Sequence, residues 1–305
     1  MELSFIVPVY HGEQTVHPLF EAIKDACKKY DYQFEVIFVW DCGPDRSWEK
    51  ILELKTKFPT VIKAIRLSRN FGQHNAIVCG FANASGDFMV TMDEDLQHNP
   101  DEVNLLVEKQ KENDYDLVYG HYPDRQHSGF RNFTSQMLKK LLEIGIPDLH
   151  KNYSAYRLIK REIALDTIQM QNSYTFIDGY FSWITQNVGS VLVSHNCRQG
   201  GISSYTLKKL ISHSINIFIT FSDLPIKLVT YLSLIFFIFT FGYAIYTLLE
   251  KLIFNNLVPG FASMIVLLGF GIGSILFGIS VVGQYIHRIN LKTTRRPNFR
   301  ISQIL

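Results

Sequence analysis

Two long runs near the carboxyl end of the sequence contain no Asp, Glu, Lys or Arg: Leu228 to Leu249 and Phe261 to Ile286. A helix needs roughly 20 apolar residues to cross about 30 Å of hydrocarbon, and each run is long enough. The alternative, a helix buried in a soluble core, rarely stays uncharged over such a length. We therefore expect a folded domain over residues 1–204 and a two-helix transmembrane hairpin over residues 225–287.

Positive charge is concentrated at the two outer ends of this pair of runs rather than in the loop that connects them. Basic residues precede the first run and follow the second: Lys208, Lys209, Lys227, Arg288, Lys292, Arg295, Arg296 and Arg300. The connecting loop, residues 250–260, carries only Glu250 and Lys251 as charged residues. Loops rich in Lys and Arg remain in the cytoplasm. The sequence therefore predicts a multi-pass protein whose folded domain and two termini are cytoplasmic, with residues 288–305 as a basic tail.

Residues 205–224, directly before the first run, have the pattern of an amphipathic juxtamembrane helix. Apolar side chains fall at helical spacing, with lysines among them: Leu207, Leu210, Ile211, Ile215, Phe218 and Ile219. A basic amphipathic helix lies in the membrane interface. A helix packed against the folded domain is the alternative.

Short apolar runs alternate with helical patterns through the first 120 residues or so. The runs cover residues 3–9, 34–39, 61–67, 88–92 and 117–119, and helical spacing covers 16–30, 48–58, 73–84 and a segment from Asp101. This alternation is typical of α/β proteins with a doubly wound, mostly parallel sheet that helices cover on both faces. Ligands of such sheets bind at the carboxyl ends of the strands.

The acidic sequence TMDEDLQHNP follows the apolar run at residues 88–92. Asp93 and Asp95 are two residues apart, and Gln97 follows them. Carboxylate oxygens at this edge of a sheet suit a hard cation such as Mg²⁺ or Mn²⁺. A solvated acidic turn that precedes the next helix is the alternative.

Other functions are less consistent with the sequence. No G-x-G-x-x-G follows the first run, and no G-x-x-x-x-G-K-[ST], H-E-x-x-H or G-x-S-x-G occurs. These absences disfavour dinucleotide, P-loop, metalloprotease and hydrolase functions. The net charge of +2 argues against nucleic acid as the main partner. The four cysteines lack C-x-x-C spacing and suit a reducing compartment.

Several segments together resemble those of a known family: FIVPVYHGE, VIFVWDCGPDRS, LSRNFGQHNAIVCGFANASGD, TMDEDLQHNP, YRLIKRE, CRQGGISSY and FSDLP. With the two apolar runs and the basic tail, they are similar to family-2 glycosyltransferases with the GT-A fold, nearly from end to end. Within that family the chain resembles the membrane-anchored polyprenyl-phosphate glycosyltransferases, the dolichyl-phosphate mannose synthase and bactoprenol glucosyltransferase group.

The resemblance implies a donor site built from several loops. The residues expected to bind the nucleotide-sugar are Pro8, Glu13, Asp41, Arg69, Asp93 and Glu94. The residues expected to hold a divalent metal, Mg²⁺ or Mn²⁺, with the donor diphosphate are Asp93, Asp95 and Gln97. For Asp41, which matches the nucleoside-binding acid of the family, a turn-forming role before Gly43 is the alternative.

The resemblance also implies an acceptor site rich in arginine. Catalytic roles are expected for Asp95, Arg125, Arg131 and Arg157. Contacts to the phosphate of the lipid acceptor are expected from Arg131, Arg198, Ser203 and Tyr205. Arginine suits these roles because its guanidinium binds phosphate in a bidentate manner.

Some positions depart from the family pattern. Trp40, Cys42 and Gly43 stand in place of an acidic-Gly-Ser turn, Tyr122 stands where an arginine is frequent, and Ala155 replaces the acid of G-D-F-R-L. A phosphate monoester is already anionic at neutral pH, so a general base is not essential. Asp178 is a candidate substitute for the missing acid, or a helix cap.

The implied activity is inverting transfer of one sugar from a nucleotide-sugar, most readily a UDP-sugar, to undecaprenyl or another polyprenyl phosphate. It is expected at the cytoplasmic face of a bacterial inner membrane, for cell-surface glycan assembly. A processive polysaccharide synthase would carry Q-x-x-R-W and more spans, and a non-catalytic membrane scaffold would not need Asp41, Asp93, Asp95 and Arg198 together. Glycines in the second run are compatible with a homo-oligomer: Gly269, Gly271 and Gly273.

Overall fold

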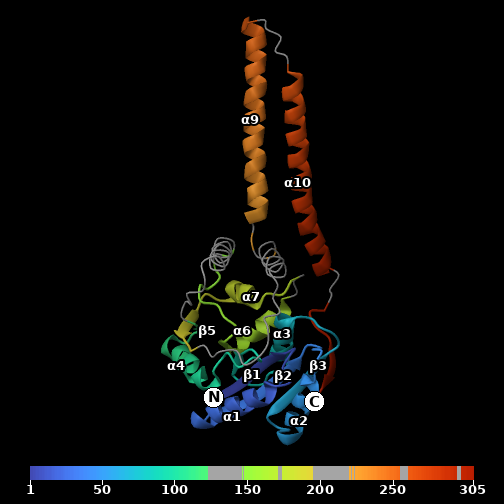
Figure 1. The fold of residues 1–305 in the computed structure, drawn as a ribbon. Helices are drawn as coiled ribbons and strands as arrows, with labels where there is room; N and C mark the ends of the chain where they lie inside the picture. The colour runs from blue at the N-terminus through green and yellow to red at the C-terminus, as the bar shows by residue number, and fades with distance from the viewer. Residues whose placement is uncertain are drawn as a thin grey trace.

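The computed structural model describes residues 1–122, 146, 148–170, 174–194, 220, 222, 224–254, 260–293 and 297–305. Within these residues an α/β domain carries two long helices that extend away from it (Figure 1). The expected alternation of strands and helices is confirmed, with element ends close to those that the apolar runs predict.

The first part of the domain consists of β1 (Glu2–Val9), α1 (Val16–Lys29), β2 (Gln33–Trp40), α2 (Ser47–Lys57), β3 (Ile62–Leu67), α3 (Gln73–Asn83) and β4 (Phe88–Thr91). A short 3₁₀ helix, η1 (Pro100–Glu102), leads into α4 (Val103–Asn113) and β5 (Leu117–His121). The later elements are β6 (Arg157–Lys160), α6 (Arg161–Gln169), α7 (Ile177–Ile184), β7 (Val188–Leu192), α9 (Leu224–Phe254), α10 (Phe261–Thr293) and β8 (Ile301–Ile304).

The described strands form one sheet in the order β7-β5-β6-β4-β1-β2-β3-β8. β1 pairs in parallel with both β2 and β4, β2 with β3, and β5 with β7. β6 is antiparallel to its neighbours β4 and β5, and β8 is antiparallel to β3. The sheet is therefore mixed but mostly parallel, as expected.

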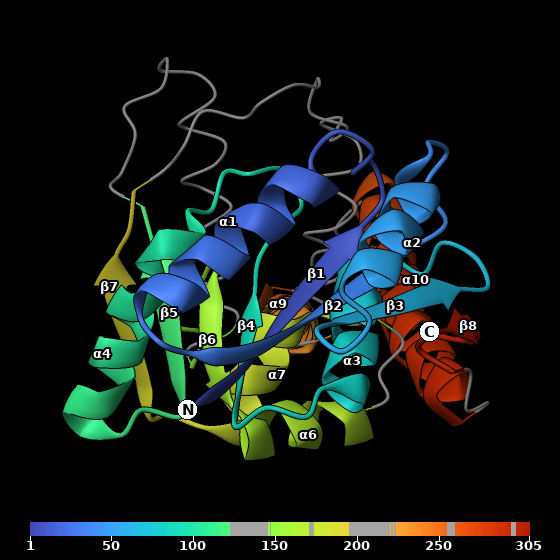
Figure 2. The ribbon, with the colours of Figure 1, turned by 90° about the horizontal axis from the view of Figure 1, so that it is seen from below.

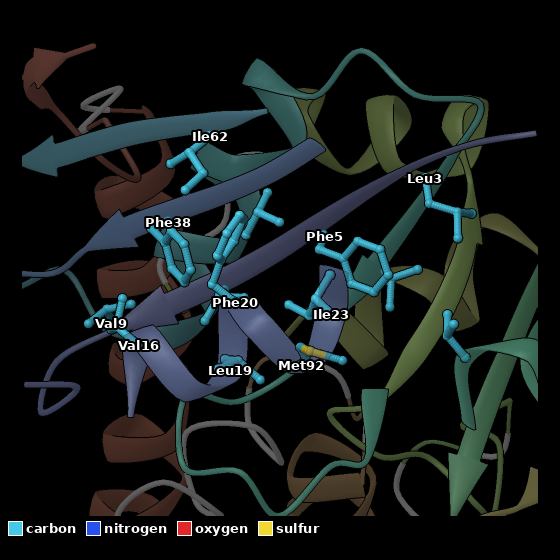
Figure 3. Packing of buried hydrophobic residues seen from close by; sticks show 14 of the residues in the cluster. Leu3, Phe5, Val9, Val16, Leu19, Phe20, Ile23, Phe38, Ile62 and Met92 are labelled. Carbon is cyan, nitrogen blue, oxygen red and sulfur yellow. The ribbon is translucent and has the colours of Figure 1, made fainter. Parts of the chain in front are cut away.

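Helices cover both faces of the sheet and bury its apolar side chains. Figure 2 shows α1, α2 and α4 on one face and α3, α6 and α7 on the other. The core under α1 contains Phe5, Phe20 and Phe38, all fully buried (Figure 3). A second apolar cluster lies under α3, α6 and α7 and includes Ile6 and Phe81. Burying one such side chain contributes roughly 1.5–3 kcal/mol.

The carboxyl end of the chain returns to the sheet after α10. Residues 301–304, which were expected to belong to a basic tail, form the edge strand β8 beside β3. Leu305 and Ala64 exchange backbone hydrogen bonds of 3.0 and 3.1 Å. The side chains of Phe299 and Ile301 pack against the second apolar cluster. The chain therefore contacts the domain again beyond the second long helix, in an interaction that its basic composition does not indicate.

α9 and α10 are each long and apolar enough to cross a membrane. Their apolar side chains face outward: Ile235 and Ile275, for example, are each 63% exposed. Such a surface is unfavourable in water and suits a bilayer. The two helices lie close to each other, because Phe236 of α9 is 3.6 Å from the position that a Cβ of Gly271 would take.

Glu35, near the start of β2, holds together the end of the sheet opposite the carboxyl ends of β1 to β4. Its carboxylate accepts hydrogen bonds from Ser4 Oγ (2.6 Å) and from the backbone N–H (2.6 Å) and Oγ (2.7 Å) of Ser85, and Lys63 Nζ lies 2.9 Å away. Burial alone would raise the pKa of Glu35, but these partners outweigh it and lower the pKa to about 2. The ionised form of Glu35 is therefore stabilised in the folded state.

Replacing Glu35 with glutamine is expected to destabilise the domain in a pH-dependent way. A carboxyl whose pKa is lowered on folding stabilises the protein above its ordinary pKa, and that stabilisation is lost as the pH falls toward the folded value, about 2 here. Thermal unfolding should therefore occur at a lower temperature for Glu35→Gln than for wild type at pH 7, with the difference narrowing at pH 3. Equal differences at the two pH values would contradict the role of the charge.

Candidate active site

The loops that follow β1, β2, β3 and β4 lie at the carboxyl edge of the sheet. β1 pairs with β4 only as far as Ile6, opposite Thr91. The next bond of this ladder would require a backbone N–H from Pro8, which proline lacks. The pairing of β1 with β4 therefore ends before Pro8, a predicted donor-site residue that is itself buried in β1.

Side chains join these four loops into a closed ring of hydrogen bonds. Glu94 joins the loop after β4 to the loop after β1, and Ser47 joins that loop to the start of α2 by accepting a backbone N–H at 2.7 Å. Asp41 joins the end of β2 to the loop after β3. Gln73, at the start of α3, closes the ring because its Nε2 donates to Asp93 Oδ1 at 2.6 Å.

Asp41 follows β2 and is only 4% exposed. Its two carboxylate oxygens accept the backbone N–H groups of Phe71 and Gly72, each at 2.7 Å. Burial raises the pKa of Asp41, and the two hydrogen bonds oppose this. Gly72 has φ of +90°, a conformation that favours glycine, so the loop can turn both N–H groups toward the carboxylate. Asp41 therefore connects two loops, in addition to any role in binding a nucleoside.

The turn after β2 departs from the family pattern, and the structure shows how its residues pack. Trp40 packs against Trp48, with ring centroids 5.9 Å apart and planes inclined by 35°, and Arg66 lies over the Trp40 ring at 5.0 Å. Cys42 has φ of +55°, and its Sγ donates to the carbonyl of Leu67 at 3.1 Å. These contacts hold the turn beside the end of β3.

Gly43 lies directly against the loop after β1. A Cβ at this position would be 1.6 Å from the carbonyl oxygen of Tyr10. Only a shift of the backbone could relieve this steric clash. Only glycine can therefore bring these two loops so close.

Gly43→Ala is expected to destabilise the protein by at least about 2 kcal/mol, because two backbone segments must separate. Thermal unfolding of the purified protein measures the change. Gly242→Ala in α9 is the matched control, since apart from its chain neighbours and its own helix backbone no atom of the described residues lies within 4 Å of its Cβ position. An unchanged unfolding temperature for Gly43→Ala would contradict the contact.

The D-x-D sequence forms a tight turn at the carboxyl end of β4. The backbone N–H of Asp93 donates to His98 Nδ1 at 3.0 Å, and Asp95 Oδ1 accepts the backbone N–H of Gln97 at 3.2 Å. Leu96 adopts a left-handed conformation, with φ of +62°. The turn keeps Asp93, Asp95 and Gln97 together at the edge of the sheet, half-buried.

The donor atoms of this turn fit a hard divalent cation. Mg²⁺ is usually bound by one or two carboxylates together with substrate phosphates, and its other ligands are water. Within the described part of the chain no cluster contains three or more His, Cys, Asp or Glu side chains arranged to hold a metal. Two carboxylates and an amide therefore suit a metal that is completed by a diphosphate, rather than a closed structural site.

His98 supports the D-x-D turn and is not indicated by the sequence pattern. It is 4% exposed, and its ring lies between those of Tyr122 and Tyr156, with centroids 6.1 and 5.2 Å away and planes inclined by 7° and 19°. Because Nδ1 accepts the N–H of Asp93, it carries no proton. Burial and the negative charges of Asp93 and Asp95 raise the pKa of Tyr122, so its phenol stays protonated near this turn.

Three further donor-site predictions fall on the same loops. Glu94 accepts two backbone N–H groups of the loop after β1, and burial raises its pKa to about 7. Glu13 is half-buried: its N–H donates to Asp45 Oδ2 at 3.1 Å, and its Oε2 accepts the N–H of Arg46 at 3.3 Å. Arg69 is exposed, with its guanidinium 4.7 Å from the Phe71 ring.

Arg157, a predicted catalytic residue, lies in the core of the domain. It is 2% exposed, and its Nη1 is 3.0 Å from Oδ1 of Asp178, which is 4% exposed. Tyr119 donates to the same oxygen at 2.9 Å. The Arg157 guanidinium therefore contacts a buried carboxylate within the domain. Asp178 thus provides a carboxylate beside Arg157, in a chain where Ala155 replaces the acid of the family motif.

The remaining predicted residues lie outside the described part of the chain: Arg125, Arg131, Arg198, Ser203 and Tyr205. The same holds for most of the predicted juxtamembrane helix, residues 205–219.

Sequence comparisons point to one family. A sequence model described as "Glycosyl transferase family 2" matches residues 4–177. The chain is 29% identical to a bactoprenol glucosyl transferase of Shigella phage SfX, over 99% of each chain. It is also 29% identical to an undecaprenyl-phosphate 4-deoxy-4-formamido-L-arabinose transferase of Photorhabdus laumondii, over 100% of this chain and 94% of that one.

Solved structures show the same fold at low identity. Glucosyl-3-phosphoglycerate synthase from Mycobacterium tuberculosis superposes with a TM-score of 0.54 at 19% identity, covering 72% of this chain and 78% of that one. A structure of the same enzyme with Mn²⁺ and uridine-diphosphate-glucose gives a TM-score of 0.52 at 19% identity, with 72% and 77% covered. The predicted GT-A fold is thereby confirmed.

Proposed function

Because the chain belongs to glycosyl transferase family 2, we propose that it transfers one sugar from a UDP-sugar to a polyprenyl phosphate, such as undecaprenyl phosphate, at the cytoplasmic face of a bacterial inner membrane. The observation that carries the proposal is that Gln73 joins Asp93, in the turn that also contains Asp95, to the loop that Asp41 holds. The relatives whose names include bactoprenol and undecaprenyl phosphate match over almost the whole chain and support the acceptor.

Asp93, Asp95 and Gln97 would hold Mg²⁺ or Mn²⁺, which supplies positive charge for the diphosphate leaving group. The loops after β1, β2 and β3 would bind the nucleotide beside it. The acceptor phosphate is already anionic at neutral pH, since its second pKa is about 6. Its oxygen would form a bond to the anomeric carbon as the bond from that carbon to the nucleoside diphosphate breaks. One such in-line displacement inverts the anomeric configuration.

The apolar helices explain how the enzyme meets an acceptor that cannot leave the bilayer. α9 and α10 would hold the domain at the surface where the lipid phosphate is exposed, which raises its effective concentration. The basic flanks support a cytoplasmic domain with both termini on that side. The lipid-linked sugar would then serve cell-surface glycan assembly.

A transfer assay tests the proposal. The purified protein in detergent is given undecaprenyl phosphate, Mn²⁺ or Mg²⁺, and a panel of radiolabelled UDP-sugars. Label should enter the lipid once per acceptor and only with the metal, so EDTA should abolish it. Release of sugar into water or growth of a polymer would instead indicate hydrolysis or a processive synthase. Absence of any reaction and of any donor binding would favour a membrane scaffold.

A further inference from the structure

Glu94 stands between the two predicted metal ligands, yet its side chain contacts another loop. Its Oε2 accepts the backbone N–H of Tyr10, and its Oε1 accepts that of His11, each at 2.9 Å. One carboxylate thus binds two successive N–H groups of the loop after β1. Two backbone N–H groups, one on each oxygen of the same carboxyl group, fix the orientation of that group relative to the loop.

The loop after β1 wraps closely around this carboxylate. A Cβ on Gly12 would lie 2.8 Å from Glu94 Oε2, so the loop approaches as near as its backbone allows. The same loop is also held by the start of α2, because the N–H of Gly12 donates to Ser47 Oγ. Glu94 is therefore the direct connection between this loop and the D-x-D turn among the hydrogen bonds that form the ring.

We propose that Glu94 is a positioning residue that makes the D-x-D turn and the loop after β1 move as one unit, so that metal and nucleotide bind cooperatively. This inference rests on the proposed function, because it takes Asp93 and Asp95 as metal ligands and the loop after β1 as part of the nucleotide site. A ligand that orders one loop would then order the other, and the second ligand would meet a site that is already arranged. The coupling must be reciprocal: metal strengthens nucleotide binding by the same factor as nucleotide strengthens metal binding.

Two variants of Glu94 test the connection, with a readout that needs neither ligand. Glu94→Ala removes both acceptors, whereas Glu94→Gln keeps one oxygen and points an NH₂ group at the other backbone N–H. In the ligand-free protein, hydrogen exchange of the Tyr10 and His11 amides should become at least about tenfold faster in Glu94→Ala, with Glu94→Gln between it and wild type. The factor by which Mn²⁺ tightens UDP binding should fall at least about fivefold.

Glu35→Gln is the matched control, since Glu35 also accepts hydrogen bonds from several partners but lies at the opposite end of the sheet. It should lower stability while leaving the Tyr10 and His11 amides and the effect of Mn²⁺ on UDP binding unchanged. The inference is overturned if neither Glu94 variant changes amide exchange, if the Mn²⁺ effect persists in them, or if Glu35→Gln reproduces both changes. A wild-type protein that binds no UDP with Mn²⁺ would refute both the proposed function and the coupling. Faster amide exchange in the Glu94 variants would even then show that Glu94 holds the loop after β1 in place.

Discussion

Asp95→Ala is expected to transfer sugar at least about 100-fold more slowly than wild type at saturating donor and metal. The carboxylate would help hold the cation that neutralises the departing diphosphate, and loss of one group that stabilises developing charge costs roughly 10²–10³ in kcat. The alanine side chain has no oxygen with which to replace it. Initial rates of label transfer to undecaprenyl phosphate, measured over a range of Mn²⁺ concentrations, give the effect on kcat and on the metal requirement.

Asp87→Asn is the matched control for this experiment. Asp87 is an exposed acid that immediately precedes β4, whereas Asp95 follows the same strand, and its carboxylate accepts only the backbone N–H of Glu2 among the contacts described for it. Its loss should change the rate less than twofold. An Asp95→Ala protein that keeps the wild-type rate and metal requirement would remove the D-x-D turn from the mechanism.

The first half of the fold can be predicted from the sequence because its strands are buried on both faces. β1 to β4 appear as short apolar runs, and α1 shows the matching apolar spacing at Leu19, Phe20 and Ile23. β6 and β8 give no such signal. Each has four residues, β6 begins with a buried arginine, and β8 follows a basic segment, so only pairing with distant strands makes them part of the sheet.

The candidate site is predictable in its residues but not in its connections. Asp93 and Asp95 can be recognised because their chemistry is local, in a turn after a strand. The partners of Asp41 lie some 30 residues away, and those of Glu94 more than 80, so their pairing depends on the order of strands in the sheet. Arg157 lies in a segment that matches a family motif, but the sequence does not indicate that its side chain is buried beside Asp178. Sequence patterns identify the type of a side chain, whereas burial and register determine what it contacts.

Asp178→Asn is expected to destabilise the domain by about 3–5 kcal/mol. The substitution removes the charge that compensates Arg157, and an uncompensated charge in a protein interior is costly. Tyr119 cannot compensate, because burial raises the pKa of its phenol well above the ordinary value and keeps it neutral. Thermal unfolding of the purified protein should occur at a temperature lower by roughly 10 °C.

The double variant Arg157→Met, Asp178→Asn separates a structural role from a catalytic one. Removing both charges should restore part of the stability lost in Asp178→Asn, since replacing a buried ion pair with neutral groups is often nearly neutral. If Arg157 only supports the core, the double variant should also transfer sugar at a rate close to that of wild type below its unfolding temperature. A stable double variant that has lost transfer would instead restore the catalytic role that the family motif predicts. Stability and transfer rate, measured on the same preparation, therefore decide whether Arg157 has a structural role, as its burial indicates, or a catalytic role, as the family motif predicts.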